Sequence, residues 1–198
     1  MEMKSQKVVN CGRCSSSLRL EGVEYCSLCL CRVVEHRVKK ALSKNLASFR
    51  DSKGKLAVVI ACPDPGSLQC TAAAYLVRRL LGAAADIKFA SEGGLSKALK
   101  NKSKAVITPM CADDLATAFL RLLIGNGWMV GKAETSSPLN ILESVTEKEL
   151  IYYAGMKKIK YREKEKGVLK QQIQNLQARY PGTVEALARS GRHLLEKD

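Results

Sequence analysis

The sequence lacks any apolar run long enough to cross a bilayer, and its first residues, MEMKSQKVV, lack the apolar stretch and small-residue cleavage site of a secretory leader. We therefore expect no membrane contact and a cytoplasmic location, where disulfides are uncommon. Acidic residues are also scarce, because 19 Asp and Glu stand against 33 Lys and Arg in 198 residues, for a formal net charge of +14. This excess favours a polyanionic partner, and nucleic acid is the usual one.

Cysteine, in contrast, is plentiful: the chain has eight, and five of them lie between residues 11 and 31. Four of these five form two C-x-x-C pairs with eleven residues between them, Cys11 with Cys14 and Cys26 with Cys29. Two such pairs can surround one tetrahedral Zn²⁺ with four thiolates. The spacing predicts a zinc ribbon over residues 1–31, and its closed ligand set leaves no open position for catalysis.

Two alternatives remain for this cluster. The four residues could be ordinary buried thiols, although paired C-x-x-C knuckles rarely arise from packing alone. Cys31 could also replace Cys29 as a ligand, since it lies two residues further on. We expect Cys31 to lie outside the site, at the start of the following helix.

A basic helix is expected next, in a linking segment over residues 32–54. Apolar residues recur every four positions between residues 30 and 49, as on the buried face of an amphipathic helix: Val34, Val38, Leu42 and Leu46. The other face is rich in Lys and Arg, and the residues that we expect to contact nucleic-acid phosphates are Arg37, Lys39, Lys40 and Lys44. The alternative is a basic face that is only solvated.

Strands and helices alternate through residues 55–160. The apolar run LAVVIA at 56–61 is typical of a strand buried on both faces, and DIKFA at 86–90 and KAVITP at 104–109 predict two more. Helices are expected over 67–82, 95–100 and 112–125. This alternation predicts a doubly wound parallel sheet, in which ligands bind beyond the carboxyl ends of the strands, at loops 62–67, 91–94 and 108–114.

The last part of the chain is predicted to be helical. Thr146 and Glu149 form a capping box, which indicates a helix beginning there and running through Tyr153. The charged run KKIKYREKEK follows at 157–166, and two amphipathic helices are expected in the segment 161–198, separated by Pro181 and Gly182.

This order of parts resembles the cytoplasmic tRNA 2-thiolation proteins, in which a zinc ribbon precedes a PP-loop ATP pyrophosphatase domain. The similar segments are YCSLCLCRVVEHRVKKAL, VVIACPDPGSLQCTAAAYLV, TPMCADDLATAFLRLLIGNG, LNILESVTEKELIYYAGMKKIKY and RYPGTVEALARS. The resemblance implies a Rossmann-like PP-loop (adenine nucleotide alpha hydrolase-like) fold with an N-terminal zinc ribbon and C-terminal helices.

The chain departs from the family at the phosphate loop. A working PP-loop reads S-G-G-x-D-S, and its backbone N–H groups bind the pyrophosphate of ATP. Here the loop reads CPDPGS over residues 62–67, so that Ser67 alone keeps its place, two prolines remove N–H donors, and Asp64 adds an anion. We expect ATP to bind poorly or not at all.

The resemblance therefore implies the non-catalytic partner subunit of the family. Such a chain would support 2-thiolation of the wobble uridine (U34) by pairing with a catalytic PP-loop thiolase as a heterodimer and by helping to bind tRNA. It would use Cys11, Cys14, Cys26 and Cys29 for zinc.

Two other functions compete with this interpretation. An active ATP-dependent tRNA sulfurtransferase would use Ser67, Asp113 and Asp114 to position ATP and magnesium, and Cys62 or Cys111 to carry sulfur. Against it, Cys62, Cys70 and Cys111 have no C-x-x-C partner, no histidine accompanies them, and buried inert thiols are the simpler explanation. The other candidate is a stand-alone zinc-ribbon RNA-binding protein, which would account for the charge and the cysteines but not for the ADDLAT and TEKEL segments.

Overall fold

The computed structural model describes residues 10–16, 20–45, 56–90, 105–124, 138–163, 165 and 167–195. Its elements follow in this order: α1 (Ser27–Asn45), β1 (Leu56–Ala61), α2 (Leu68–Leu81), the 3₁₀ turn η1 (Gly82–Ala84), β2 (Ala85–Ala90), β3 (Ala105–Ile107), α4 (Ala112–Ile124), α5 (Glu147–Met156), α6 (Val168–Arg179) and α7 (Thr183–Leu195). Helix α1 begins three residues before the predicted Leu30, so Cys29 and Cys31 both lie in it.

The sheet has three parallel strands in the order β2–β1–β3. Strand β1 pairs with a neighbour on each side, with Val58 opposite Ile87 of β2 and Ala105 of β3. This central position explains its continuous apolar sequence, because both faces of β1 are buried. The prediction of a parallel α/β sheet is confirmed, while the helix expected at 95–100 and the loop at 91–94 lie outside the described residues.

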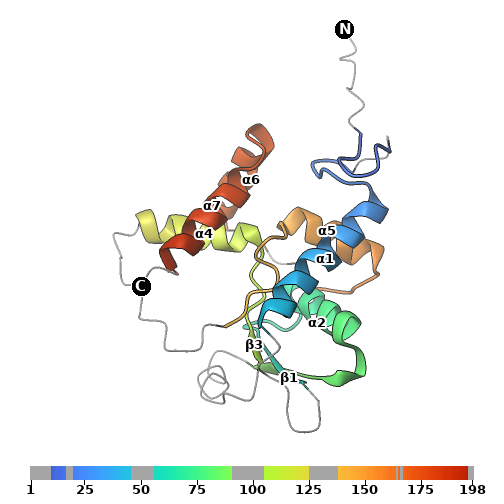
Figure 1. The fold of residues 1–198 in the computed structure, drawn as a ribbon. Coiled ribbons are helices and arrows are strands. Elements are labelled where there is room, and N and C mark those ends of the chain that lie inside the picture. The colour runs from blue at the N-terminus through green and yellow to red at the C-terminus, as the bar shows by residue number, and fades with distance from the viewer. Residues whose placement is uncertain are drawn as a thin grey trace.

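Helices α1, α2 and α5 form the layer that packs on the sheet (Figure 1). The core of this layer contains Leu30 of α1, Leu76 of α2 and Tyr153 of α5, which are fully buried against Val58 and Ile60 of β1, among other residues. On the other face of the strands, Val59, Ala61 and Val106 form a smaller cluster. The predicted helical stripe at Val34, Val38 and Leu42 is buried, whereas Leu46 lies outside the described residues.

One carboxylate connects the three helices of this layer. Glu35 of α1 accepts hydrogen bonds from Arg79 of α2 at 2.8 Å and from the Tyr153 hydroxyl of α5 at 3.1 Å, and it lies 3.3 Å from Lys157. Burial opposes the charge of Glu35, but the hydrogen bonds from Lys157, Tyr153 and Arg79 outweigh it and lower the pKa of Glu35.

Helices α4, α6 and α7 form a second group, which lies to one side of the first layer (Figure 1). Ala116 of α4, Ile173 of α6 and Val184 of α7 are buried together there. A Cβ at Gly191 would lie 3.0 Å from the Cβ of Phe119, so the glycine allows α7 to approach α4 closely. The two predicted C-terminal helices thus pack on α4.

The start of α5 has the predicted capping box. The Thr146 hydroxyl accepts a hydrogen bond from the backbone N–H of Glu149 at 3.3 Å, and the Glu149 carboxylate accepts one from the N–H of Thr146 at 2.9 Å. These bonds satisfy two donors at the helix N-terminus and fix where α5 begins. No helix in the described ranges is long and apolar enough to span a membrane.

Candidate functional site

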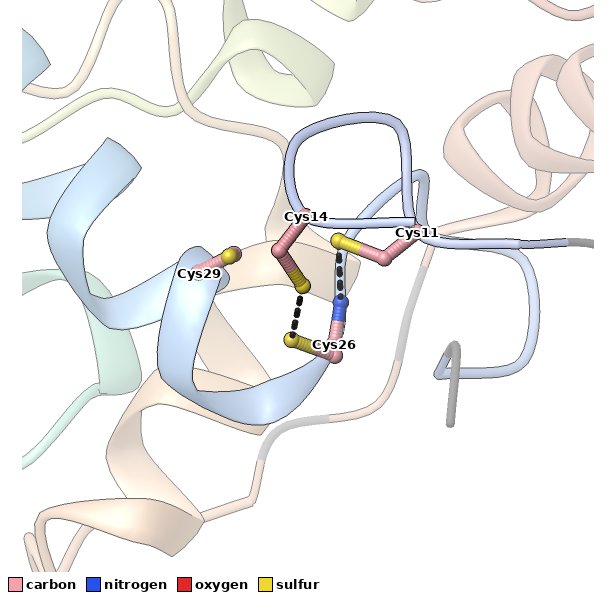
Figure 2. Close-up of side chains that lie close together, drawn as sticks. All are labelled: Cys11, Cys14, Cys26 and Cys29. Atoms are coloured by element: carbon pink, nitrogen blue, oxygen red, sulfur yellow. Dashed lines mark hydrogen bonds between the residues drawn. The ribbon is translucent and has the colours of Figure 1, made fainter. Parts of the chain in front are cut away.

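The four predicted zinc ligands converge on one point (Figure 2). Cys11 and Cys14 come from the turn before α1, Cys26 precedes α1 directly, and Cys29 lies in its first turn. Their four sulfur atoms lie within 4.8 Å of one another, and those of Cys14 and Cys26 are 3.7 Å apart. A tetrahedron with metal–sulfur bonds of about 2.3 Å has edges of about 3.8 Å. The four cysteines could therefore hold one metal ion.

Backbone hydrogen bonds contribute to the shape of this cysteine cluster. The N–H of Ser15 donates to the carbonyl of Cys11 at 3.0 Å, which closes the first knuckle, and the N–H of Gly12 donates to the carbonyl of Glu24 at 2.8 Å. The N–H of Cys26 points at the Cys11 sulfur at 3.3 Å (Figure 2). The two halves of the site are thus joined by main-chain contacts.

The protonation of the cluster is uneven. The Cys26 N–H is the main cause that lowers the pKa of Cys11, to about 6, whereas burial raises the pKa of Cys29 to about 12. Cys11 is thus ready to bind a cation as a thiolate at neutral pH, while Cys29 must lose a proton when a metal binds.

Cys31 contacts α5 and is not part of the cysteine cluster. Its thiol lies 3.9 Å from the sulfur of Met156 in α5, and burial is the main cause that raises its pKa. The described residues contain one group of metal-ligating side chains close enough to share an ion, and Cys31 is not part of it.

A pocket of about 660 Å³ lies beyond the carboxyl ends of the strands, where the sequence predicts ligand binding. The loop after β1 and residues 108–110 after β3 line it, as expected. Residues that follow α5 line it as well, together with Lys170 of α6, and their part in the pocket was not predicted from the sequence: Tyr161, Arg162, Glu163, Glu165 and Gly167.

The loop between β1 and α2 uses its own donors internally. The carboxylate of Asp64 accepts a hydrogen bond from the N–H of Gly66 at 3.0 Å, and the carbonyl of Asp64 accepts one from the N–H of Ser67 at 3.0 Å. The Ser67 hydroxyl caps α2 by accepting a hydrogen bond from the N–H of Cys70 at 3.4 Å. Groups that bind phosphate in a working loop are therefore engaged with the protein itself.

A disulfide joins the two ends of this loop, contrary to the expectation of free thiols. Cys62, which follows β1, is bonded to Cys70 in the first turn of α2, and their Cα atoms are 6.1 Å apart. The chain reverses direction between the strand and the helix, which brings the two residues into the range that a disulfide can bridge. A shared metal or persulfide site would require Cys62 to pair with Cys111. Cys62 is instead bonded to Cys70.

Cys111 and the two aspartates after it form a buried polar network. The Cys111 thiol donates to Asp114 at 3.0 Å, Lys170 of α6 donates to Asp114 at 2.6 Å, and Asp113 accepts hydrogen bonds from the N–H of Glu147 at 2.6 Å and from Gln174 at 3.1 Å. The active-enzyme alternative assigns Asp113 and Asp114 to ATP and magnesium. Here both carboxylates have protein partners that tie α4 to α5 and α6.

The charges of this network are set by burial and by its ion pairs. Burial is the main cause that raises the pKa of Asp113 and of Cys111, so the Cys111 thiol stays protonated. Burial opposes the charge of Lys170, but the acidic groups around it outweigh this effect and raise its pKa. Lys170 also lies 2.8 Å from Glu147. Sequence periodicity gives no signal for the pairings that join α4, α5 and α6, because their partners lie more than 20 residues apart.

The basic face of α1 divides into two kinds of residue. Arg37 donates to the carbonyl of Ser144 at 2.8 Å and pairs with Glu149 at 3.0 Å, so it fastens α1 to α5. Lys39 and Lys40 are exposed, and the side chain of Lys44 lies outside the described residues. Of the predicted phosphate contacts, Lys39 and Lys40 are thus placed at the surface, while Arg37 has protein partners.

Comparison with known proteins finds no matching family model and no curated protein of similar sequence. Among solved structures, the chain is similar to the U34-tRNA thiolase NcsA from Methanococcus maripaludis, which was solved with its 4Fe-4S cluster. The TM-score is 0.74 at 14% sequence identity, over 98% of this chain and 89% of that one. The likeness shows that the chain has the fold of this PP-loop thiolase, and it confirms the predicted fold class.

Proposed function

We propose that this chain is a non-catalytic subunit of a tRNA thiolation complex, in which it pairs with an active PP-loop thiolase, helps to bind tRNA and supports 2-thiolation of the wobble uridine. One observation carries the proposal. The fold is similar to that of a U34-tRNA thiolase over 98% of the chain, yet in the loop expected to bind phosphate the N–H of Gly66 already donates to the Asp64 carboxylate.

The charge and bonding of the loop oppose ATP binding. A phosphate placed at the N-terminus of α2 would be repelled by the Asp64 carboxylate, whose charge is offset in part by Arg162 at 3.9 Å. The N–H of Gly66, a donor that a phosphate would need, is already bonded to that carboxylate. Pro63 and Pro65 have no N–H to offer.

The metal in the four-cysteine site is proposed to be zinc. A tetrahedral set of four thiolates suits Zn²⁺, and the sulfur atoms, within 4.8 Å of one another, suit one ion. A 4Fe-4S cluster would need thiolates further apart, because each iron occupies its own corner of a cube. Zinc bound by Cys11, Cys14, Cys26 and Cys29 would stabilise the N-terminal fold and supply no reaction chemistry, since no coordination position stays open.

The tRNA surface is proposed to include Lys39 and Lys40, which lie on α1, the helix whose first turn carries Cys29. The formal charge of +14 would bring the chain to a polyanion, and lysines placed at the surface would contact its phosphates. Arg37 is assigned instead to the contact between α1 and α5, because its guanidinium pairs with Glu149.

The test combines copurification with a nucleotide assay. The full-length chain, tagged and purified from its native cell, should bring with it a PP-loop enzyme with an intact S-G-G-x-D-S loop. Alone, it should convert no ATP to AMP. Emergence without such a partner would contradict the proposal and favour a stand-alone RNA binder.

The active sulfurtransferase remains the second candidate, because the sheet-edge pocket of about 660 Å³ is still lined by Ser67, Asp114 and Cys62. AMP formation by the isolated chain would support the enzyme. Loss of this activity in both Ser67→Ala and Ser67→Asn would assign Ser67 to ATP, whereas activity that Ser67→Ala abolishes and Ser67→Asn keeps would show that Ser67 acts by capping α2.

A further inference from the structure

The chain contains sulfur in two oxidation states. Four free thiols are grouped as a metal site, while Cys62 and Cys70 form a disulfide. A protein that keeps four thiols available for a metal belongs in reducing surroundings, where disulfides are usually transient and take part in catalysis or redox sensing. The Cys62–Cys70 bond is therefore expected to open and close rather than to persist.

The position of the bond gives it a route to a reductant. Cys62 and Cys70 are only 2% and 3% exposed, but both line the sheet-edge pocket of about 660 Å³. A pocket of this volume admits a small thiol, whereas a protein reductant would need the sulfurs at the surface.

We propose that Cys62 and Cys70 form a reversible redox site, which exchanges with a small-molecule thiol that enters the sheet-edge pocket. In the first step, the thiolate of the small molecule attacks the sulfur of Cys62; the bond between Cys62 and Cys70 breaks, and its electron pair leaves on Cys70. A second small thiolate then attacks the small molecule's sulfur in the mixed disulfide, and the electron pair of the broken bond leaves on Cys62. This releases the Cys62 thiolate and the small-molecule disulfide, so two electrons pass to the protein, which takes up two protons at neutral pH.

The N-terminus of α2 favours the Cys70 sulfur as the leaving group. Cys70 lies in the first turn of α2, three residues after the capping Ser67, where the positive end of the helix dipole stabilises a thiolate. Cys62 follows the end of β1 and has no such helix. Because the better leaving group is the thiolate of lower basicity, the attack falls on Cys62, and the mixed disulfide forms there.

The bond also holds the loop that carries Asp64. The cross-link closes a loop of sequence separation 8 around Asp64 and Gly66, which are joined by a hydrogen bond of 3.0 Å. Reduction removes this constraint and leaves the loop with its hydrogen bonds alone. The proposal concerns the redox state of the pocket and does not depend on a role in tRNA thiolation.

The experiment uses the whole chain with Zn²⁺ added, equilibrated with mixtures of reduced and oxidised glutathione, quenched with acid, alkylated with iodoacetamide in denaturant and digested with trypsin. Both cysteines lie in one tryptic peptide, residues 56–78, because Lys55 precedes it and Arg78 ends it. The peptide should change from no iodoacetamide adduct to two adducts across the glutathione series, while the circular dichroism stays that of the folded chain. The matched control is Cys31→Ser, which removes a thiol next to Met156 and should leave the transition unchanged.

Trapping of the mixed disulfide tests the direction of attack. The oxidised wild-type chain, mixed with limiting reduced glutathione and quenched rapidly with acid, should carry the glutathione adduct on Cys62 and a free thiol at Cys70, as read by fragmentation of the 56–78 peptide. Two adducts at every glutathione ratio would overturn the proposal, because no disulfide would then form. A disulfide that stays intact at the most reducing glutathione ratio while the chain is folded, and is reduced at that ratio only in denaturant, would also overturn it, because the bond would be structural. A glutathione adduct on Cys70 rather than on Cys62 would refute the order of attack.

Discussion

Replacing Lys170 with methionine should test the buried network that joins α4, α5 and α6. The Lys170 ammonium lies 2.6 Å from Asp114 and 2.8 Å from Glu147. Its side chain is 14% exposed, and those of Asp114 and Glu147 are 25% and 9% exposed. Methionine keeps most of the length and apolar stem of lysine but removes the charge, so that two carboxylates lose their cation.

The expected cost is about 3 kcal/mol in the free energy of unfolding. Removing one partner of a buried ion pair typically costs about 3–5 kcal/mol, because the charge left behind is uncompensated. The lower end applies here, since Asp114 keeps its hydrogen bonds from the Cys111 N–H and from Gln69, and its side chain is partly exposed. For a chain of this size, about 3 kcal/mol corresponds to a fall in Tm of roughly 6–12 °C.

Urea unfolding of the chain with Zn²⁺ added, followed by circular dichroism, measures this cost. The matched control is Lys88→Met, because Lys88 pairs with Asp86 at 3.6 Å while both side chains are largely exposed, and it should change stability by less than about 0.5 kcal/mol. A cost below about 1 kcal/mol for Lys170→Met would refute the argument that the network needs this cation.

Three further predictions concern charge. The pKa of Glu35 is lower in the folded chain than its value near 4.5 in the unfolded chain, so its stabilising contribution is fully present above pH 4.5 and is lost as the pH falls through the folded pKa. Glu35→Gln should therefore be less stable than the wild type at pH 6, by about 1–2 kcal/mol in urea unfolding. This difference in stability should shrink toward pH 3. Because Cys11, with a pKa of about 6, is already ionised at pH 7, calorimetry in buffers of different ionisation enthalpy should show fewer than four protons released per zinc bound, and zinc affinity should fall more steeply below pH 6. Arg37→Gln should lower Tm without changing the salt dependence of tRNA binding, whereas Lys40→Gln should leave Tm unchanged and reduce the magnitude of the log–log salt slope by up to about 1.

The local structure of this chain follows from its sequence to a large extent. LAVVIA is strand β1 over the predicted residues 56–61, and the Thr146–Glu149 capping box starts α5 as expected. Both features depend on residues within one element, so periodicity and spacing are enough to find them. The two C-x-x-C knuckles could also be found from local spacing, because four cysteines at this spacing rarely occur together for another reason than metal binding.

The contacts between distant elements were not predictable in this way. The sequence shows that Arg37 lies on a basic helix face, but it does not show that Arg37 forms an ion pair with Glu149, 112 residues later. Cys62 and Cys70 look like isolated thiols until the turn between β1 and α2 brings their Cα atoms to 6.1 Å. Pairings of this kind depend on how the elements pack, and local sequence patterns do not encode them.

The most direct test of the proposed function is the 2-thiouridine content of tRNA position 34, measured by mass spectrometry in cells that lack this chain and in cells complemented with it. Deletion should remove the modification, and the wild-type chain, Ser67→Ala and Ser67→Asn should each restore it, because the chain is proposed to contribute no phosphate-loop chemistry. Unchanged 2-thiouridine after deletion, or restoration that requires Ser67, would contradict the account of a non-catalytic thiolation subunit.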